Sequence, residues 1–239
     1  MNTRPYIIIN GKDSRLIPGL IITELPPITK PKIRTQIETI DGRDGDLVTE
    51  LGYAAYDKTI NIGLTYDYNI DDIISFFNQS GVIVFGNEPD KYYRFAIYSQ
   101  INFERLVRFK KSKFALHVQP FKFSVSETLK TFTFDQDNGS FNIRNNGNYF
   151  SRPIITITGS DDIDVYINGV KVLTVELNTD QTIIINSEEM NATDPTGEYL
   201  LNRLVIGNYD NIKLTPGKNT ISFVGDVSRA TINNYSRWI

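Results

Sequence analysis

The sequence predicts a mostly β protein of two domains, with one short helix in the first domain. Along many short segments, apolar and polar residues alternate at every second position, as they do in strands that bury one face. Turn sequences rich in Asn, Asp and Gly separate these segments. Convincing helical spacing of apolar residues occurs in one segment, which begins near Asn69.

The length and composition are those of an ordinary globular protein. The chain has 239 residues, of which 40% are hydrophobic and 22% are charged, and this length suits one large or two modest domains. No apolar run approaches the ~18 residues that span a bilayer. The apolar block near the N-terminus is too short for a signal peptide, so we expect no membrane insertion. Cysteine is absent, which excludes disulfides and thiolate metal sites.

The seam between the two domains is expected between His117 and Pro153, with the boundary near Lys130. The proline at 120 interrupts a strand ladder, and turn sequences follow it twice. Residues 1–130 hold 17 basic and 15 acidic residues, a net charge of +2; residues 131–239 hold 8 and 13, a net charge of −5. Neither domain has the basic excess of a nucleic-acid binder, so we expect no nucleic-acid binding.

The first domain, residues 1–130, is expected to be a β-sandwich or split-barrel-like frame. Its alternating or β-branched segments predict strands at 6–9, 20–22, 33–39, 47–49, 58–65, 82–85, 92–98, 103–109 and 113–123. The turn GNEPDK joins two of these strands into a long hairpin from Val82 to Tyr98. In the segment 33–39 polar residues lie opposite β-branched ones, so one face should be wet.

The single helix is predicted from Asn69 onwards. Ile70, Ile73 and Phe77 fall on one helical face. Asn69 is a good N-cap, and Gly81 is well placed to end the helix. A helix of about nine residues is marginal alone, so we expect it to pack on a sheet.

The second domain, residues 131–239, is expected to be an antiparallel β-sandwich. Strands are predicted at 154–158, 165–167, 171–177, 182–186, 219–224 and 230–238. The dipeptide Asn168-Gly169 favours a type I′ hairpin turn between two of them. The polar segment 187–197 is expected to be a loop.

The residues indicate no catalytic, cofactor or metal site, so we expect a protein that is not an enzyme. His117 is the lone histidine, lies in an alternating strand, and has no recognisable partners for acid–base chemistry. Phosphate-binding glycine motifs are absent. No pair among the 28 acidic residues stands out as suited to glycoside hydrolysis.

Three charged segments resemble binding sites but have simpler interpretations. Asp41, Asp44 and Asp46 resemble the start of a calcium loop, yet Gly52 stands where an EF-hand needs a glutamate. The aspartates in 161–164 lie at an expected turn, where carboxylates often bond to the backbone. The basic segment 108–113 could meet an acidic partner, although such runs are more often solvated loops.

Sugar binding is an alternative, because small β-sandwiches often carry it. Stacking on a sugar ring needs an exposed aromatic platform. The one tryptophan, Trp238, is expected to be buried in the sandwich, which leaves Tyr199 and Tyr209 as possible platforms.

Several motifs, taken in order, resemble the distal tail protein (Dit) family of siphophages, the long, flexible-tailed bacteriophages. The first domain contains DGRDGDLVTELGY, one short helix and a strand ending in QPFKFS. The second contains NNGNYFSRP and LTPGKNTI and finishes in RW. The residues that carry the resemblance are Gly147, Asn148, Pro153, Pro216, Gly217, Asn219, Arg237 and Trp238.

The resemblance implies a structural role at the tail tip of a virion assembled in the host cytoplasm. In that family the N-terminal domains form a homohexameric ring, the baseplate hub that joins the tail tube protein to the tail-tip proteins. The C-terminal domains resemble galectins or carbohydrate-binding modules and often hold receptor-binding proteins. The carbohydrate-binding module that recognises host envelope glycans remains the alternative function.

A closed ring needs a head-to-tail interface between copies. The hairpin from Val82 to Tyr98, with the aromatic side chains of Tyr92, Tyr93 and Phe95, is the predicted contact. The competing interpretation is that this hairpin packs only within its own domain.

Overall fold

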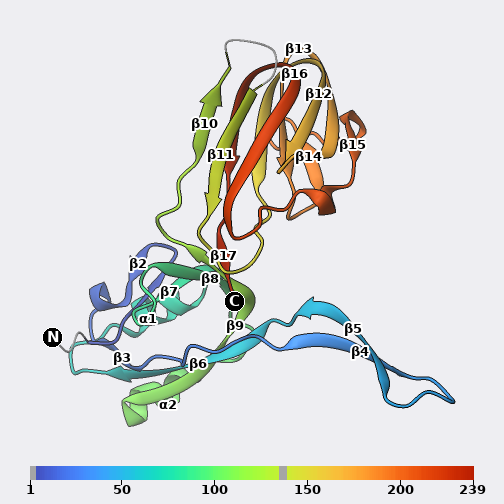
Figure 1. Ribbon diagram of the computed structural model, residues 1–239. Helices are drawn as coiled ribbons and strands as arrows, with labels where there is room; N and C mark the ends of the chain where they lie inside the picture. The colour runs from blue at the N-terminus through green and yellow to red at the C-terminus, as the bar shows by residue number, and fades with distance from the viewer. Residues whose placement is uncertain (1–3, 135–138) are drawn as a thin grey trace. The chain divides into compact units, whose positions relative to one another are not determined.

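A computed structural model describes residues 4–134 and 139–239 (Figure 1). The chain forms two compact units, one containing residues up to Val125 together with Ile239, and the other containing Ser126–Trp238. Both units are built mainly from antiparallel strands, as the sequence predicts. In the described residues no helix is long and apolar enough to cross a membrane.

The first unit is a strongly curved antiparallel sheet with two short helices. Its strands are β1 (Ile7–Ile9), β2 (Lys12–Asp13), β3 (Leu20–Glu24), β4 (Ile33–Thr39), β5 (Asp46–Tyr53), β6 (Tyr56–Leu64), β7 (Gly81–Phe85), β8 (Lys91–Ala96) and β9 (Lys111–Ser124). The helices are α1 (Ile70–Phe77), α2 (Phe103–Phe109) and the 3-10 turn η1 (Ser14–Leu16). The main sheet has the order β2–β1–β7–β8–β9–β6–β3, whereas β4 and β5 pair only with each other.

The predicted helix is confirmed as α1. The Asn69 side chain accepts a hydrogen bond from the Asp71 amide at 3.0 Å, which caps the first turn. Ile73, Phe76 and Phe77 are buried against the sheet. This packing supplies the stability that so short a helix lacks alone.

The prediction of a strand at 103–109 is wrong, because this segment is the helix α2. The Asn102 side chain accepts from the Arg105 amide at 2.8 Å, an N-cap contact. Leu106 is fully buried, and Phe103 and Val107 pack on the same core at helical spacing. The helix ends at Lys110, whose φ of 56° is left-handed.

The predicted hairpin from Val82 to Tyr98 is present, because β7 and β8 pair antiparallel with Val82 opposite Arg94, but it is short and does not extend from the sheet. The strands β7 and β8 are only five and six residues long, and both lie inside the main sheet. The extended hairpin is β4–β5, which Figure 1 shows reaching out beyond β6.

The second unit is a sandwich made largely by three long strands that pass through both layers. Its elements are β10 (Lys130–Thr133), β11 (Gly139–Asn145), β12 (Ile154–Ile167), β13 (Val170–Asn186), β14 (Asn191–Thr193), β15 (Val205–Gly207), β16 (Gly217–Asn233), β17 (Arg237–Trp238), and the 3-10 turns η2 (Asn202–Leu204) and η3 (Tyr209–Asn211). The first half of β12 pairs with 181–186 of β13, and its second half pairs with 170–177. The segments predicted as separate strands are therefore halves of continuous ones.

The long strands change layer at register shifts. In β12 the shift from Gly159 to Asp161 breaks the ladder with β13, and a second shift follows opposite β16. A Cβ atom on Gly159 would lie 2.2 Å from the Asp226 carbonyl oxygen, so only glycine fits at this crossing. Bulges of this kind bend strands.

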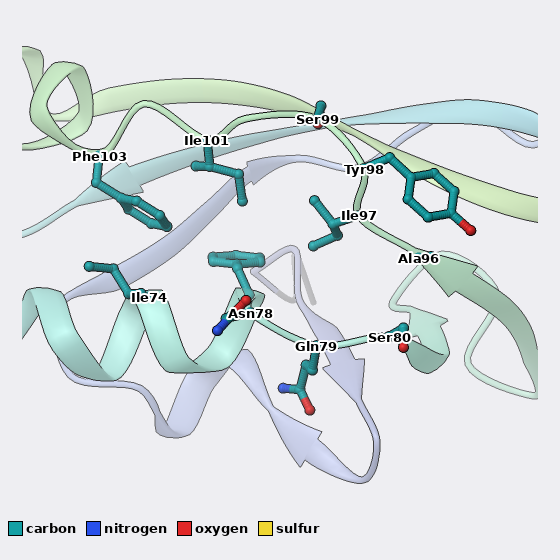
Figure 2. Close-up of a pocket in the computed structure, with 11 residues that line it drawn as sticks. Ile74, Asn78, Gln79, Ser80, Ala96, Ile97, Tyr98, Ser99, Ile101 and Phe103 are labelled. Carbon is teal, nitrogen blue, oxygen red and sulfur yellow. The ribbon is translucent and has the colours of Figure 1, made fainter.

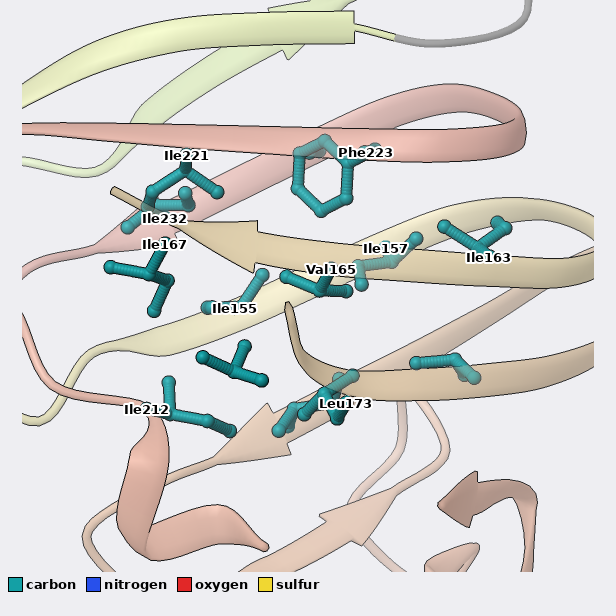
Figure 3. Packing of buried hydrophobic residues seen from close by; sticks show 14 of the residues in the cluster. Ile155, Ile157, Ile163, Val165, Ile167, Leu173, Ile212, Ile221, Phe223 and Ile232 are labelled. Atoms are coloured by element: carbon teal, nitrogen blue, oxygen red, sulfur yellow. The ribbon is translucent and has the colours of Figure 1, made fainter. Parts of the chain in front are cut away.

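Both layers contribute to one core. Ile155 and Ile157 come from the first half of β12, and Ile163, Val165 and Ile167 come from the second half. All five are at most 5% exposed, and Figure 3 shows them converging with Phe223 and Ile221 of β16. The alternation of buried and exposed residues within each half is what the sequence pattern predicts.

Truncation of this core should destabilise the second unit strongly. Ile157→Ala removes three carbon atoms from a fully buried site, and such changes lower the free energy of unfolding by about 2–5 kcal/mol. Chemical denaturation of the full chain should show the loss. Val224→Ala, at a 48% exposed position of β16, is the matched control and should change stability by less than about 0.5 kcal/mol. Equal effects of the two variants would contradict this assignment of the core.

Candidate functional site

The β4–β5 hairpin is the most exposed regular element of the first unit. Its exposed apolar side chains include Ile37, Val48 and Leu51, which are 60%, 54% and 50% exposed. Ile37 and Val48 face each other across the two strands. A two-stranded hairpin is marginally stable in water by itself, and exposed apolar side chains gathered on one element indicate an interaction surface.

The tip of this hairpin is acidic. Asp41 and Asp44 lie in its turn, and Asp46 begins β5. Residues 33–53 hold five acidic and two basic residues, a net charge of −3. Among the described residues no group of three His, Cys, Asp or Glu side chains could hold a metal ion. The aspartates therefore give the hairpin a negative end.

A basic surface lies on α2 and the start of β9. Residues 102–113 hold five basic residues and one acidic residue, a net charge of +4. Arg105, Lys111 and Lys113 line a cavity of about 620 Å³ together with polar side chains that include Asn61 and Asn102. Phe109, at the end of α2, is 63% exposed.

The predicted contact residues Tyr92, Tyr93 and Phe95 belong mostly to the interior of the first unit. Tyr93 is fully buried and Phe95 is 5% exposed. Tyr92 is half-buried and its ring stacks on Phe123 at a centroid distance of 5.4 Å. Tyr93 and Phe95 thus have almost no side-chain surface to offer another copy, whereas Tyr92 stays a predicted contact.

Tyr93 belongs to a buried polar cluster that the sequence analysis missed. Its hydroxyl donates to Glu88 Oε2 at 2.9 Å, and Lys122 Nζ donates to Glu88 Oε1 at 2.8 Å. Lys58 is 4% exposed, and its Nζ lies 5.1 Å from the centroid of the Tyr93 ring. Burial lowers the pKa of Lys58 to about 8, an effect that the charge of Glu88 opposes. Burial likewise raises the pKa of Tyr93.

The cluster holds the strap, residues 25–32, that leads into β4. Lys58 Nζ donates to the Pro27 carbonyl oxygen at 2.7 Å. Asn87 Nδ2 donates to the Pro26 carbonyl oxygen at 3.1 Å. Because a proline has no amide hydrogen, the strap is held here through its carbonyl groups. The root of the exposed hairpin is thereby tied to the core.

A groove of about 620 Å³, lined by both apolar and polar residues, lies between the end of α1 and residues 96–103. Figure 2 shows Ile97, Ile101 and Phe103 on one side and Ile74 on the other. Asn78, Gln79 and Ser80 supply polar atoms at its edge. None of the lining residues is charged, so the groove offers no acid–base pair for chemistry.

His117 has an acidic partner that its sequence context does not reveal, and the two tyrosines considered as sugar platforms differ in exposure. His117 Nδ1 is 2.8 Å from Asp57 Oδ1, and its ring lies 5.5 Å from the exposed ring of Tyr98. In the second unit Tyr199 is 67% exposed, whereas Tyr209 packs against the core. Trp238 is half-buried and is not part of that core, contrary to expectation.

Asn219 holds together the turn that carries the LTPGKN motif. This fully buried side chain accepts hydrogen bonds from the Thr215 amide and from Asn168 Nδ2, and donates to the Thr215 carbonyl at 2.7 Å. Pro216 is exposed, and Gly217 has a φ of 97°, which favours glycine. The motif therefore links this turn to the hairpin turn at Asn168.

The other motif residues tie the C-terminal segment to the 145–153 segment. Arg237 is 3% exposed, and its Nε donates to the Phe150 carbonyl at 2.6 Å. A Cβ atom on Gly147 would lie 2.0 Å from the Arg237 carbonyl oxygen, which requires glycine there. The Pro153 carbonyl accepts from Ser187 Oγ at 2.6 Å, and Asn148 is exposed. Within the second unit these residues therefore have structural roles.

Lys58 should make stability depend on pH above pH 8. Its pKa is about 8 in the folded chain and near 10.5 when unfolded, so between these values the unfolded chain binds more protons. In this range the free energy of unfolding of the wild type should rise with pH, relative to that of the Lys58→Met variant, by up to about 1.4 kcal/mol per pH unit. Below pH 8 the difference between the two proteins should be constant.

Denaturant titrations from pH 7 to pH 10 measure this difference. Lys30→Met is the matched control, because Lys30 lies in the same strap and is exposed. If the difference in the free energy of unfolding between the wild type and Lys58→Met stays constant across the whole pH range, the lowered pKa of Lys58 is contradicted.

Comparison with known proteins gives matches among solved structures. No protein-family model matches the sequence, and no curated protein sequence matches it. The crystal structure of SPP1 Dit (gp 19.1), described as a paradigm of the hub adsorption apparatus in phages that infect Gram-positive bacteria, is similar with a TM-score of 0.60 and 17% identity. The match covers 96% of this chain and 98% of that chain.

A chain of the phage p2 baseplate, in its activated conformation with Sr, is similar with a TM-score of 0.50 and 10% identity. This match covers 96% of this chain and 97% of that chain. Both similarities extend over nearly the full length of each protein, so they include both units. The chain has a Dit-like fold, and the resemblance inferred from its sequence is confirmed at the level of the fold.

Proposed function

We propose that this chain is a structural protein of a phage tail tip. The observation that supports this most strongly is the fold similarity to SPP1 Dit over 96% of the chain.

In the proposed assembly, the domain of residues 1–130 forms a homohexameric ring, and the galectin-like domain of residues 131–239 projects from it. The ring joins the tail tube protein to a tail-tip protein, and the projecting domain holds a receptor-binding protein. The chain is made in the host cytoplasm and works at the virion tail tip. These partners follow from the family resemblance of the sequence motifs.

The β4–β5 hairpin is the proposed self-contact within the ring. It has the exposed apolar side chains that a contact needs, whereas Tyr93 and Phe95 are buried in the core of the first unit. Tyr92 stands on the exposed side of β8 and is kept as a secondary contact. Interfaces between copies bury roughly 800 Å² per partner, so more than the hairpin tip must take part.

The mass of the purified protein tests the proposal. The chain weighs 27.2 kDa, and light scattering should give about six times that mass, with rings in negative-stain micrographs. A monomer at all concentrations that binds a glycan array would instead favour the carbohydrate-binding module, with Tyr199 as its exposed platform.

Polar substitution of the hairpin should weaken the ring without unfolding the chain. Ile37→Ser with Val48→Ser removes two exposed, facing apolar side chains. We expect sedimentation to show self-association at least about tenfold weaker, a change of about 1.4 kcal/mol. The melting temperature of the protein should not change. Val170→Ser, at a 65% exposed position of the second unit, is the control. Unaltered association of the double variant would argue against this contact.

A further inference from the structure

We propose that the acidic β4–β5 hairpin of one copy docks on the basic α2 surface of the next copy. The basic α2 surface is formed by Arg105, Arg108, Lys110, Lys111 and Lys113. This inference rests on the self-assembly proposed above and identifies the two surfaces that meet. It starts from charge: the hairpin carries a net charge of −3, and residues 102–113 carry +4.

The charges on these two surfaces have few partners inside the chain. In the described residues no ion pair involves Asp41, Asp44, Arg105, Lys111 or Lys113. Lys110 lies over the Tyr68 ring at 4.3 Å, which leaves its charge uncompensated. Two uncompensated surfaces of opposite sign attract each other across an interface and select its register.

The two surfaces lie at opposite ends of one ladder and so do not serve each other within a copy. The hairpin ends at Tyr53, just before β6 begins at Tyr56. The basic surface adjoins Lys111, which pairs with Gly63 near the other end of β6. At about 3.3 Å per residue, the two ends of this ladder are roughly 25 Å apart.

This separation gives the interface its direction. A contact between two different patches, placed at opposite ends of the same unit, is head-to-tail and repeats from copy to copy. Such a contact closes into a ring when the rotation between copies allows it. Contacts that use the same patch on both copies would stop at a dimer.

The basic surface also has a suitable shape. Its cavity of about 620 Å³ is lined by three cationic side chains, by the amides of Asn61, Gln100 and Asn102, and by one acid, Glu24. Glu24 is engaged by Asn61 Nδ2 at 2.5 Å. The cationic donors of Arg105, Lys111 and Lys113 suit carboxylate side chains such as those at the hairpin tip. The exposed ring of Phe109 offers an apolar neighbour to Ile37 and Val48.

Charge reversal tests the pairing. The hairpin variant carries Asp41→Lys and Asp44→Lys, and the surface variant carries Arg105→Glu and Lys113→Glu; all four positions are exposed. Each variant alone should associate at least tenfold more weakly than the wild type in sedimentation at low salt. An equimolar mixture should recover rings, because the lysines introduced on the hairpin then meet the glutamates introduced on the surface, and the unaltered acidic hairpin meets the unaltered basic surface.

Two controls complete the experiment. Glu176→Lys with Lys218→Glu reverses the same kinds of charge at exposed positions of the second unit and should leave association unchanged. Added salt should weaken the association of the wild type more steeply than the association of the double variant Asp41→Asn, Asp44→Asn, which lacks two of the charges. Circular dichroism verifies that every variant is folded.

The outcomes separate this inference from the proposed function. A wild-type protein that stays monomeric overturns both. Wild-type rings that persist in either reversal variant, or folded variants whose mixture fails to reassemble, overturn the docking inference and leave the tail-tip assignment standing. Weakened single variants with recovery on mixing support it.

Discussion

Residues Tyr56–Gly63 of β6 pair with Lys111–Val118 of β9 without a register shift, and the rest of the first unit depends on this ladder. The strand β9 continues past the ladder to pair with β8, so the sheet is joined through it. The register also fixes where the attached elements lie. The hairpin leaves one end of the ladder and α2 meets the other, which is why the two oppositely charged surfaces lie apart in a single copy.

The sequence was most informative where local chemistry decides the structure. The cap at Asn69 and the turn at Asn168-Gly169 depend on neighbouring residues only, and both are present as expected. The segment 103–109 misled because Phe103, Val107 and Phe109 also fit an alternating pattern; the Asn102 cap was the signal that favoured a helix. In the second unit the predicted strands are present, although the last one is interrupted between Asn233 and Arg237. The expected loop 187–197 contains the strand β14, and β11 and β15 were missed. The continuity of β12 through Gly159 depends on contacts distant in sequence.

The candidate surfaces were harder to foresee. Aromatic residues in a strand look alike whether they face a partner or the interior. The Tyr93 hydroxyl is satisfied inside the unit by Glu88, five residues away, and Glu88 is in turn held by Lys122, which is distant in the chain. The β4–β5 hairpin could have been recognised from its sequence. Each strand has one uncharged face, but pairing places the uncharged face of one strand beside the charged face of the other. Glu50 and Asp46 thus lie on the side of Ile37, so neither side of the hairpin is uniformly apolar.

The passage of β12, β13 and β16 through both layers has a mechanical consequence for the second unit. In most sandwiches the layers are separate sheets held together by side-chain packing, which a pulling force can peel apart. Here the covalent backbone itself crosses from layer to layer at Gly159. Tension on one layer is therefore carried into the other along the chain, and the unit should deform as one body.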